Sequence, residues 1–150
     1  MKKTLKGFTL IELLIVIGIL VVLMAGALVA INPFQQFAQA NDANRWSGVT
    51  TIMNAVYQNV IDNQGTFTCA AGAIPTVATI MGSDTVGGEY DICSCLVTDY
   101  VGAMPSDPQT GSYTSCTVYS TGYDILRDST TGRVTISASD AQTGTIQITR

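Results

Sequence analysis

The chain has 150 residues, of which 47% are hydrophobic and 12% are charged, and its formal net charge is −4. This composition excludes a disordered chain, and the length allows one domain of modest size. All three lysines lie before residue 7, so the rest of the chain has only arginines as cations and a formal charge of −7. An acidic body of this kind binds phosphate poorly, which argues against a nucleic acid as the partner.

Residues 8–31 form the first predicted element, an apolar run whose polar members are Thr9, Glu12 and two glycines. As a helix, this run would be roughly 36 Å long, against about 30 Å of hydrocarbon in a bilayer. The lysines Lys2, Lys3 and Lys6 precede it. The positive-inside rule therefore places the N-terminus in the cytoplasm and the body outside, which predicts a single-pass membrane protein.

Helical periodicity continues through residues 32–62, where apolar residues recur mostly three or four positions apart. They are Phe34, Phe37, Ala38, Val49, Ile52, Met53, Val56 and Val60. We therefore expect this segment to be the amphipathic second half of one long helix. Pro33 lacks an amide proton and crowds the preceding turn, which predicts a helix kink near Asn32 and Pro33. The alternative is that the Asn-Pro pair only marks where an ordinary anchor leaves the membrane.

Residues 63–150 are rich in Thr, Ser and Gly and contain short β-prone runs, which indicates an extracytoplasmic, β-rich head. We expect strands at residues 76–80, 114–119, 133–138 and 145–149, with a further candidate at 123–126. Residues 92–101 are compatible with a short helix or a strand. The head is small for an independent core, so the apolar stripe of the helix must supply part of it. The predicted fold class is α+β, with one long N-terminal helix packed on a small antiparallel sheet.

Four cysteines lie in the predicted head, at Cys69, Cys93, Cys95 and Cys116. In an oxidising compartment, two disulfides are the simplest interpretation. A bond between the two cysteines of the C-x-C motif would close a very tight ring, so we expect Cys69 to join one of them and Cys116 the other. The alternatives are free thiols or a zinc site, for which the C-x-C spacing and the lack of histidine are unfavourable.

Glu12 stands within the apolar run, and a carboxylate at the centre of a membrane helix costs about 2.5 to 3.5 kcal/mol, with a smaller cost near the helix end. Residues 8–31 contain no basic residue, so the partner of Glu12 must be a free amine or another chain. A cut after Gly7 would create such an amine at Phe8. In a bundle of staggered helices, Glu12 of one chain would then neutralise Phe8 of its neighbour.

Residues 6–12, KGFTLIE, followed by the uncharged residues 13–26, resemble the processing and assembly signal of type IV prepilins and the related pseudopilins. Residues 31–45, INPFQQFAQANDANR, are similar to the helix of that family, and residues 100–111, YVGAMPSDPQTG, resemble a loop of small pilins and pseudopilins. The resemblance implies that residues 1–7 are a leader peptide ending at Gly7. It also implies that Phe8 becomes the N-methylated mature N-terminus and that Glu12 is the assembly carboxylate.

The same resemblance implies a structural role and a set of partners. These are a prepilin peptidase and methyltransferase, other copies of the chain and other pilins in a helical filament, and a membrane platform with its assembly ATPase. The protein would lie in the membrane before assembly and in an extracellular filament on the cell surface afterwards. Adhesion, twitching motility, DNA uptake and secretion by a pseudopilus all remain open as the task of the filament.

Two other export routes compete with this interpretation. A Sec signal peptide would be cut near the small residues Ala25–Ala27, and a plain signal anchor would keep Met1. Glu12 and the length of the apolar run disfavour the signal peptide. Mass spectrometry of the mature N-terminus separates all three routes.

An enzyme is disfavoured by the residue types that the chain contains. It has no histidine and, after the leader, no lysine, so neither a Cys/His nor a Ser/Lys pair can form. We expect no cofactor. The resemblance also raises a calcium site, because some pseudopilins hold calcium in an acidic loop of this kind. Asp99 and Asp107 are the candidate calcium ligands, although no EF-hand spacing supports them.

Overall fold

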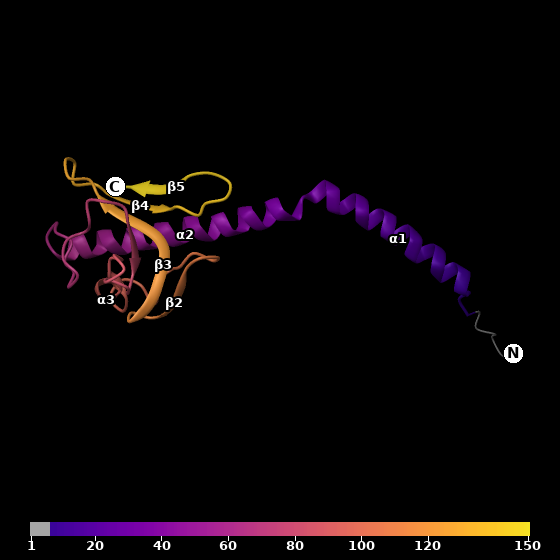
Figure 1. The fold of residues 1–150 in the computed structure, drawn as a ribbon, viewed down its shortest axis with the longest axis horizontal. Helices are drawn as coiled ribbons and strands as arrows, with labels where there is room; N and C mark the ends of the chain where they lie inside the picture. Colours follow the sequence, from indigo (N-terminus) through magenta and orange to yellow (C-terminus); the bar gives the residue numbers. More distant parts are fainter. Residues whose placement is uncertain (1–6) are drawn as a thin grey trace. The chain divides into compact units, whose positions relative to one another are not determined.

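The structure is a computed structural model that describes residues 7–150 (Figure 1). The predicted leader therefore lies outside the described residues except for Gly7, as do the three lysines. The chain divides into two compact units, one that ends at Phe37 and one that comprises Ala38–Arg150.

The first unit consists of helix α1, Leu10–Ile31, and the first turn of helix α2, Pro33–Asp62. Between the helices, Asn32 adopts a left-handed conformation with φ of 46°. The Asn32 carbonyl accepts hydrogen bonds from the amides of Gln35 and Gln36, at 3.1 and 3.4 Å. Pro33 is the first residue of α2, where its missing amide proton costs no helical hydrogen bond. The long helix is thus interrupted at one residue, and the angle of a kink there stays a prediction.

In the second unit, α2 buries one face and exposes the other, as its periodicity predicts. Buried residues recur along one stripe of the helix. They are Asp42, Arg45, Gly48, Val49, Ile52, Met53, Ala55, Val56 and Asn59. The helix ends at Asp62, and Gly65 follows with φ of 91° while its amide donates to the carbonyl of Val60 at 2.8 Å. A left-handed glycine after the last turn is a common helix stop.

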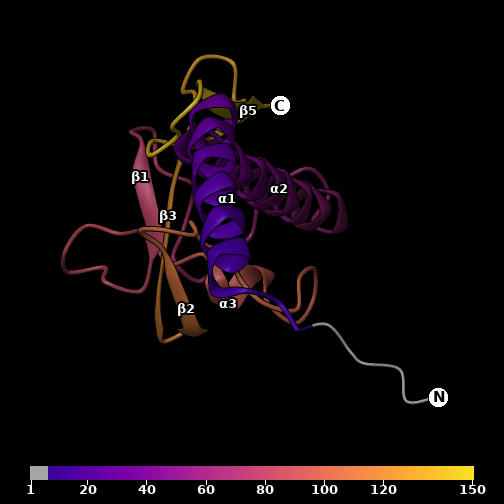
Figure 2. The ribbon, with the colours of Figure 1, turned by 90° about the vertical axis from the view of Figure 1, so that its right-hand side faces the viewer.

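Five strands form one antiparallel sheet around β3, Val118–Arg127. One edge of β3 pairs with β1, Thr79–Gly82, and the two strands lie side by side in Figure 2. The other edge pairs first with β2, Ser112–Ser115, and then with β4, Val134–Ala138, which in turn pairs with β5, Ile146–Thr149. The α+β class is therefore confirmed.

The sheet and α2 share one hydrophobic core. Apolar residues of the buried stripe, such as Ile52 and Val56, cluster with Tyr123, Ile125 and Ile136 from the central strands. Figure 1 shows the sheet strands lying along the second half of α2. Gly48 allows a close approach at this contact, because a Cβ atom there would lie 2.9 Å from the hydroxyl oxygen of Tyr123.

Three of the strand predictions were wrong in their boundaries. The strand expected at residues 76–80 is β1, which begins three residues later, at Thr79, and ends at Gly82. The expected strand at residues 114–119 is in fact the end of β2 and the start of β3, which pair through Ser115 and Val118. The expected separate strand at 123–126 belongs to β3. The turn between β2 and β3 consists of Cys116 and Thr117, neither of which is a typical turn former. The ambiguous segment 92–101 contains a short helix, α3, Cys93–Leu96.

Candidate processing and assembly site

The peptide bond between Gly7 and Phe8 lies before the start of α1, outside any helix or strand. Both residues are exposed, and the Phe8 side chain keeps 79% of its surface accessible. Exposed backbone without regular hydrogen bonds is where proteases cut most readily. Among the residues that the structure describes, none covers the peptide bond predicted to be cleaved.

Thr9 caps the start of α1. Its backbone is extended, and its hydroxyl oxygen accepts a hydrogen bond from the amide of Glu12 at 3.3 Å. This hydrogen bond satisfies one of the amides that a helix leaves unpaired at its N-terminus. Sequence reasoning missed this role of Thr9, although Thr-x-x-Glu ahead of an apolar run is a known capping signal.

Glu12 is the only acidic residue in the first turn of α1, and it is exposed. The N-terminal end of a helix carries a partial positive charge from its aligned peptide dipoles, which favours a carboxylate there. This field partly stabilises Glu12 even without a partner. It does not replace a full counter-charge, because the dipole effect is worth only about 0.3 to 1 kcal/mol.

The whole of α1 lacks a covering surface. None of its residues is buried, and its large apolar side chains remain between 47% exposed at Val16 and 86% exposed at Val29. Covering one such side chain stabilises by about 1.5 to 3 kcal/mol relative to leaving it in water. By length and composition, the helix is able to cross a membrane. It therefore needs lipid or other apolar helices around it.

In the second unit, the most heavily buried polar cluster is built on Arg45. Its guanidinium binds Asp107 with two hydrogen bonds, from Nε to Oδ2 at 2.5 Å and from Nη2 to Oδ1 at 3.1 Å. Nη1 donates to Asp42 Oδ1 at 2.9 Å, and Nη2 donates to the side-chain oxygen of Gln109 at 2.9 Å. Arg45 is fully buried, so one cation is held between two carboxylates out of water.

Asp42 fixes the loop between β4 and β5. Its carboxylate accepts hydrogen bonds from the amide of Gln142, at 3.0 and 3.1 Å, and from the amide and hydroxyl of Thr143, both at 2.6 Å. Burial alone would raise the pKa of Asp42, but the hydrogen bonds from Thr143, Gln142 and Arg45 outweigh it and hold the pKa well below its ordinary value. Asp42 is therefore ionised at neutral pH.

Asp107 fixes the loop before β2 in the same way. Besides Arg45, its carboxylate accepts from the amides of Gln109 and Thr110, at 2.8 and 3.1 Å. Burial alone would raise the pKa of Asp107. The hydrogen bonds from Arg45 and from these two amides outweigh burial, so the pKa of Asp107 lies below its ordinary value. The hydrogen bond to Asp107 in turn raises the pKa of Arg45. The cluster thus ties α2 to two loops that are far away in sequence.

This geometry is unfavourable for Asp107 as a calcium ligand. Its carboxylate is already neutralised by Arg45, so a calcium ion would have to displace a buried guanidinium. Asp99 is exposed, and its carboxylate accepts a hydrogen bond from the hydroxyl of Thr98 at 3.3 Å. Within residues 7–150, no group of three or more acidic, cysteine or histidine side chains is arranged to hold a metal ion. The Asp99 and Asp107 pair therefore gains no support as a calcium site.

The structure joins the four cysteines in two disulfides, Cys69–Cys95 and Cys93–Cys116. Both cysteines of the C-x-C motif lie in α3, so this one helical turn holds the loop after α2 and also the turn between β2 and β3. The buried hydroxyl of Tyr119 fixes the start of α3, since it accepts from the amide of Cys93 at 3.1 Å and donates to Asp91 Oδ1 at 2.8 Å. Disulfides that close loops of this size contribute about 2 to 4 kcal/mol each.

Comparison with known proteins supports the predicted signal in the N-terminal part of the chain. Residues 2–28 match the family model of the prokaryotic N-terminal methylation motif. The match includes Gly7, Phe8, Glu12 and most of α1, so the chain carries the prepilin-type signal. No curated protein and no solved structure matches the chain.

Proposed function

We propose that this protein is a structural subunit of a type IV pilus-like filament. The observation that carries the proposal is α1, an apolar helix without any covering surface that begins within the matched methylation motif and continues past it. A bilayer would cover this helix before assembly, and the α1 helices of neighbouring subunits would cover it afterwards. In this role the protein has no substrate to turn over, and its chemistry is its own processing.

Processing would proceed in two steps at one end of α1. A prepilin peptidase cuts the exposed bond between Gly7 and Phe8 on the cytoplasmic side, and a methyltransferase modifies the new amino group of Phe8. The helix is kept, because the cut lies ahead of it. The acidic, disulfide-containing body then lies outside the cytoplasmic membrane, consistent with the lysines of the leader remaining inside.

Glu12 would set the register of assembly. Glu12 lies four residues after Phe8, which would correspond to roughly 6 Å along the axis if the helix extended back to Phe8 in the filament. A subunit shifted along the filament axis by about that distance brings its Glu12 beside the amino group of Phe8 in a neighbour. In an apolar surrounding, this pair would be more favourable than either charge alone. Other pilins, a membrane platform and an assembly ATPase complete the expected machinery.

Mass spectrometry of the intact protein from its native cells tests the proposal. N-methylated Phe8 at the mature N-terminus supports it, while a start near Leu28 would indicate a signal peptide and a retained Met1 a simple anchor. Electron microscopy then separates the remaining roles. Abundant surface filaments that contain the protein indicate a pilus, and processed protein without such filaments indicates a pseudopilin of a type II secretion or DNA-uptake system.

A further inference from the structure

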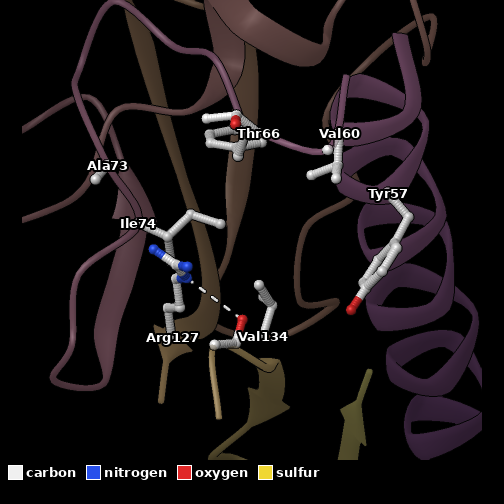
Figure 3. A pocket seen from close by; sticks show the side chains of 10 residues that line it. Tyr57, Val60, Thr66, Ala73, Ile74, Arg127 and Val134 are labelled. Carbon is white, nitrogen blue, oxygen red and sulfur yellow. Dashed lines mark hydrogen bonds between the residues drawn. The ribbon is translucent and has the colours of Figure 1, made fainter. Parts of the chain in front are cut away.

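A pocket of about 180 Å³ lies in the second unit where α2 ends. Its walls come from the last turns of α2, the loop that follows, and the hairpin between β3 and β4 (Figure 3). The lining combines apolar side chains, including Val60, Phe67, Ile74 and Val134, with polar groups that include Tyr57 and Arg127. Figure 3 shows Arg127 beside Ile74 and Val134 at this pocket. We call it the Arg127 pocket.

The charge of Arg127 is not compensated within residues 7–150, where the arginine forms no ion pair. Its side chain donates one hydrogen bond, from Nε to the carbonyl of Gly132 at 3.3 Å. The neighbouring Asp128 turns its carboxylate to the amides of Thr130 and Thr131, at 2.9 and 2.6 Å. A pocket with apolar side chains on one part of its lining and an unpaired cation on another suits an apolar group that carries a carboxylate next to it.

A loop of the same chain has that chemistry. Residues 84–89, which we call the Val86 knob, display a valine that is 99% exposed between Asp84 and Glu89. The knob is closed by its own hydrogen bonds, from the amide of Gly87 to Asp84 Oδ1 at 2.8 Å and from the amide of Asp84 to Glu89 Oε2 at 2.9 Å. A preformed loop loses little conformational entropy when it binds.

The knob and the pocket lie toward opposite ends of β3. Arg127 is the last residue of the strand, whereas the knob begins two residues after Gly82, which pairs with Ser120. Seven residues of strand separate these two points, or about 23 Å. One chain therefore cannot fill its own pocket with its own knob, whereas a second copy is able to do so.

We infer that the Val86 knob of one subunit docks in the Arg127 pocket of a second copy, with Asp84 beside the guanidinium. This inference rests on the proposed filament function. The contact joins two different surfaces, so each pair keeps one free knob and one free pocket. Heterologous contacts propagate into open helical assemblies when the rotation between copies does not close into a ring. The head thereby adds a second contact to the one made by the α1 helices.

Cysteine cross-linking in assembled filaments tests the contact. The double variant Val86→Cys/Ala73→Cys places one thiol on the knob and one at an exposed position of the pocket lining. The four native cysteines are in disulfides, so the new thiols react selectively. After mild oxidation, we expect a ladder of covalent multimers on non-reducing gels. The matched control Val86→Cys/Ser129→Cys, with its second thiol on an exposed turn residue that does not line the pocket, should lack the ladder.

A charge variant gives a second readout. Arg127→Gln in the double-cysteine background should remove most of the ladder, while Arg133→Gln changes the net charge equally at an exposed arginine that does not line the pocket and should keep it. Filaments that form but give no ladder would overturn the inference and leave the filament function intact. Cross-links from residue 73 to a different protein would also overturn it. If the processed wild-type protein forms no filament in its native cells, the proposed function itself fails.

Discussion

Replacing Arg45 with methionine would leave two carboxylates buried without a cation. The substitution removes four hydrogen bonds, while Asp42 and Asp107 keep only their donors from the two loops. Breaking a buried ion pair by removing one partner costs about 3 to 5 kcal/mol. We expect Arg45→Met to lower the free energy of unfolding of the second unit by that amount.

Trp46 makes the measurement direct. It is the only tryptophan of the chain and the residue next to Arg45, so its fluorescence reports on this part of α2. Unfolding of the full-length protein in detergent micelles is followed in guanidinium chloride with the disulfides intact. Arg133→Met serves as the control, because Arg133 is exposed and a surface substitution usually stays within about 0.5 kcal/mol.

A double-mutant cycle decides whether the cost comes from uncompensated charge. Asp107→Asn keeps an oxygen that can accept from the amides of Gln109 and Thr110 but removes one buried carboxylate. Arg45→Met/Asp107→Asn should therefore be less destabilised than the sum of the two single variants, by about 1 to 3 kcal/mol. Additive effects, or a loss below about 1 kcal/mol for Arg45→Met alone, would refute the electrostatic account of the cluster.

Four further predictions follow from the same structure. Folding lowers the pKa values of Asp42 and Asp107. Their contribution to stability is therefore fully present above the unfolded pKa of about 3.9 and is lost as the pH falls through the lower folded values. Unfolding curves at pH 7 and pH 5 should both show the cluster intact. Gly7→Leu should leave the precursor uncut on immunoblots, with Gly18→Leu as the control, and normal processing of Gly7→Leu would contradict the cleavage assignment. Glu12→Ala should be cut normally but fail to enter filaments among wild-type subunits, and its incorporation at wild-type levels would contradict the pairing with Phe8. Non-reducing peptide mapping should recover Cys69 with Cys95 and Cys93 with Cys116, and four free thiols would overturn the disulfides.

Local patterns predicted the helices well. The apolar run of α1 requires only composition and length, and the buried stripe of α2 follows from a spacing of three or four residues. The break at Asn32 is also local, since a proline at the first position of a helix is a familiar start signal. The class of the fold follows from these helices and from the β-prone texture of the head.

Contacts between distant residues account for the errors. Arg45 and Asp107 are 62 positions apart, and nothing in the local pattern of the 100–111 loop indicates that its aspartate faces an arginine. A signal did exist, because Arg45 falls on the same helical stripe as Val49, Ile52 and Val56 and is therefore expected to be buried. A buried arginine requires a carboxylate partner. The β2–β3 turn was missed because it contains no typical turn-forming residue. The disulfide at Cys116 and the pairing of the two strands define it instead.

The two disulfides have a mechanical consequence. Between Cys69 and Cys116 the chain has 47 peptide steps, which would extend to roughly 160 Å if pulled straight. Under tension the covalent path is far shorter, because it crosses from Cys69 to Cys95, runs through Ser94 to Cys93, and crosses again to Cys116. A stretched head would therefore bear load through three residues of α3, while the loops on either side stay slack. In a filament built from such subunits, tension would therefore not extend these loops.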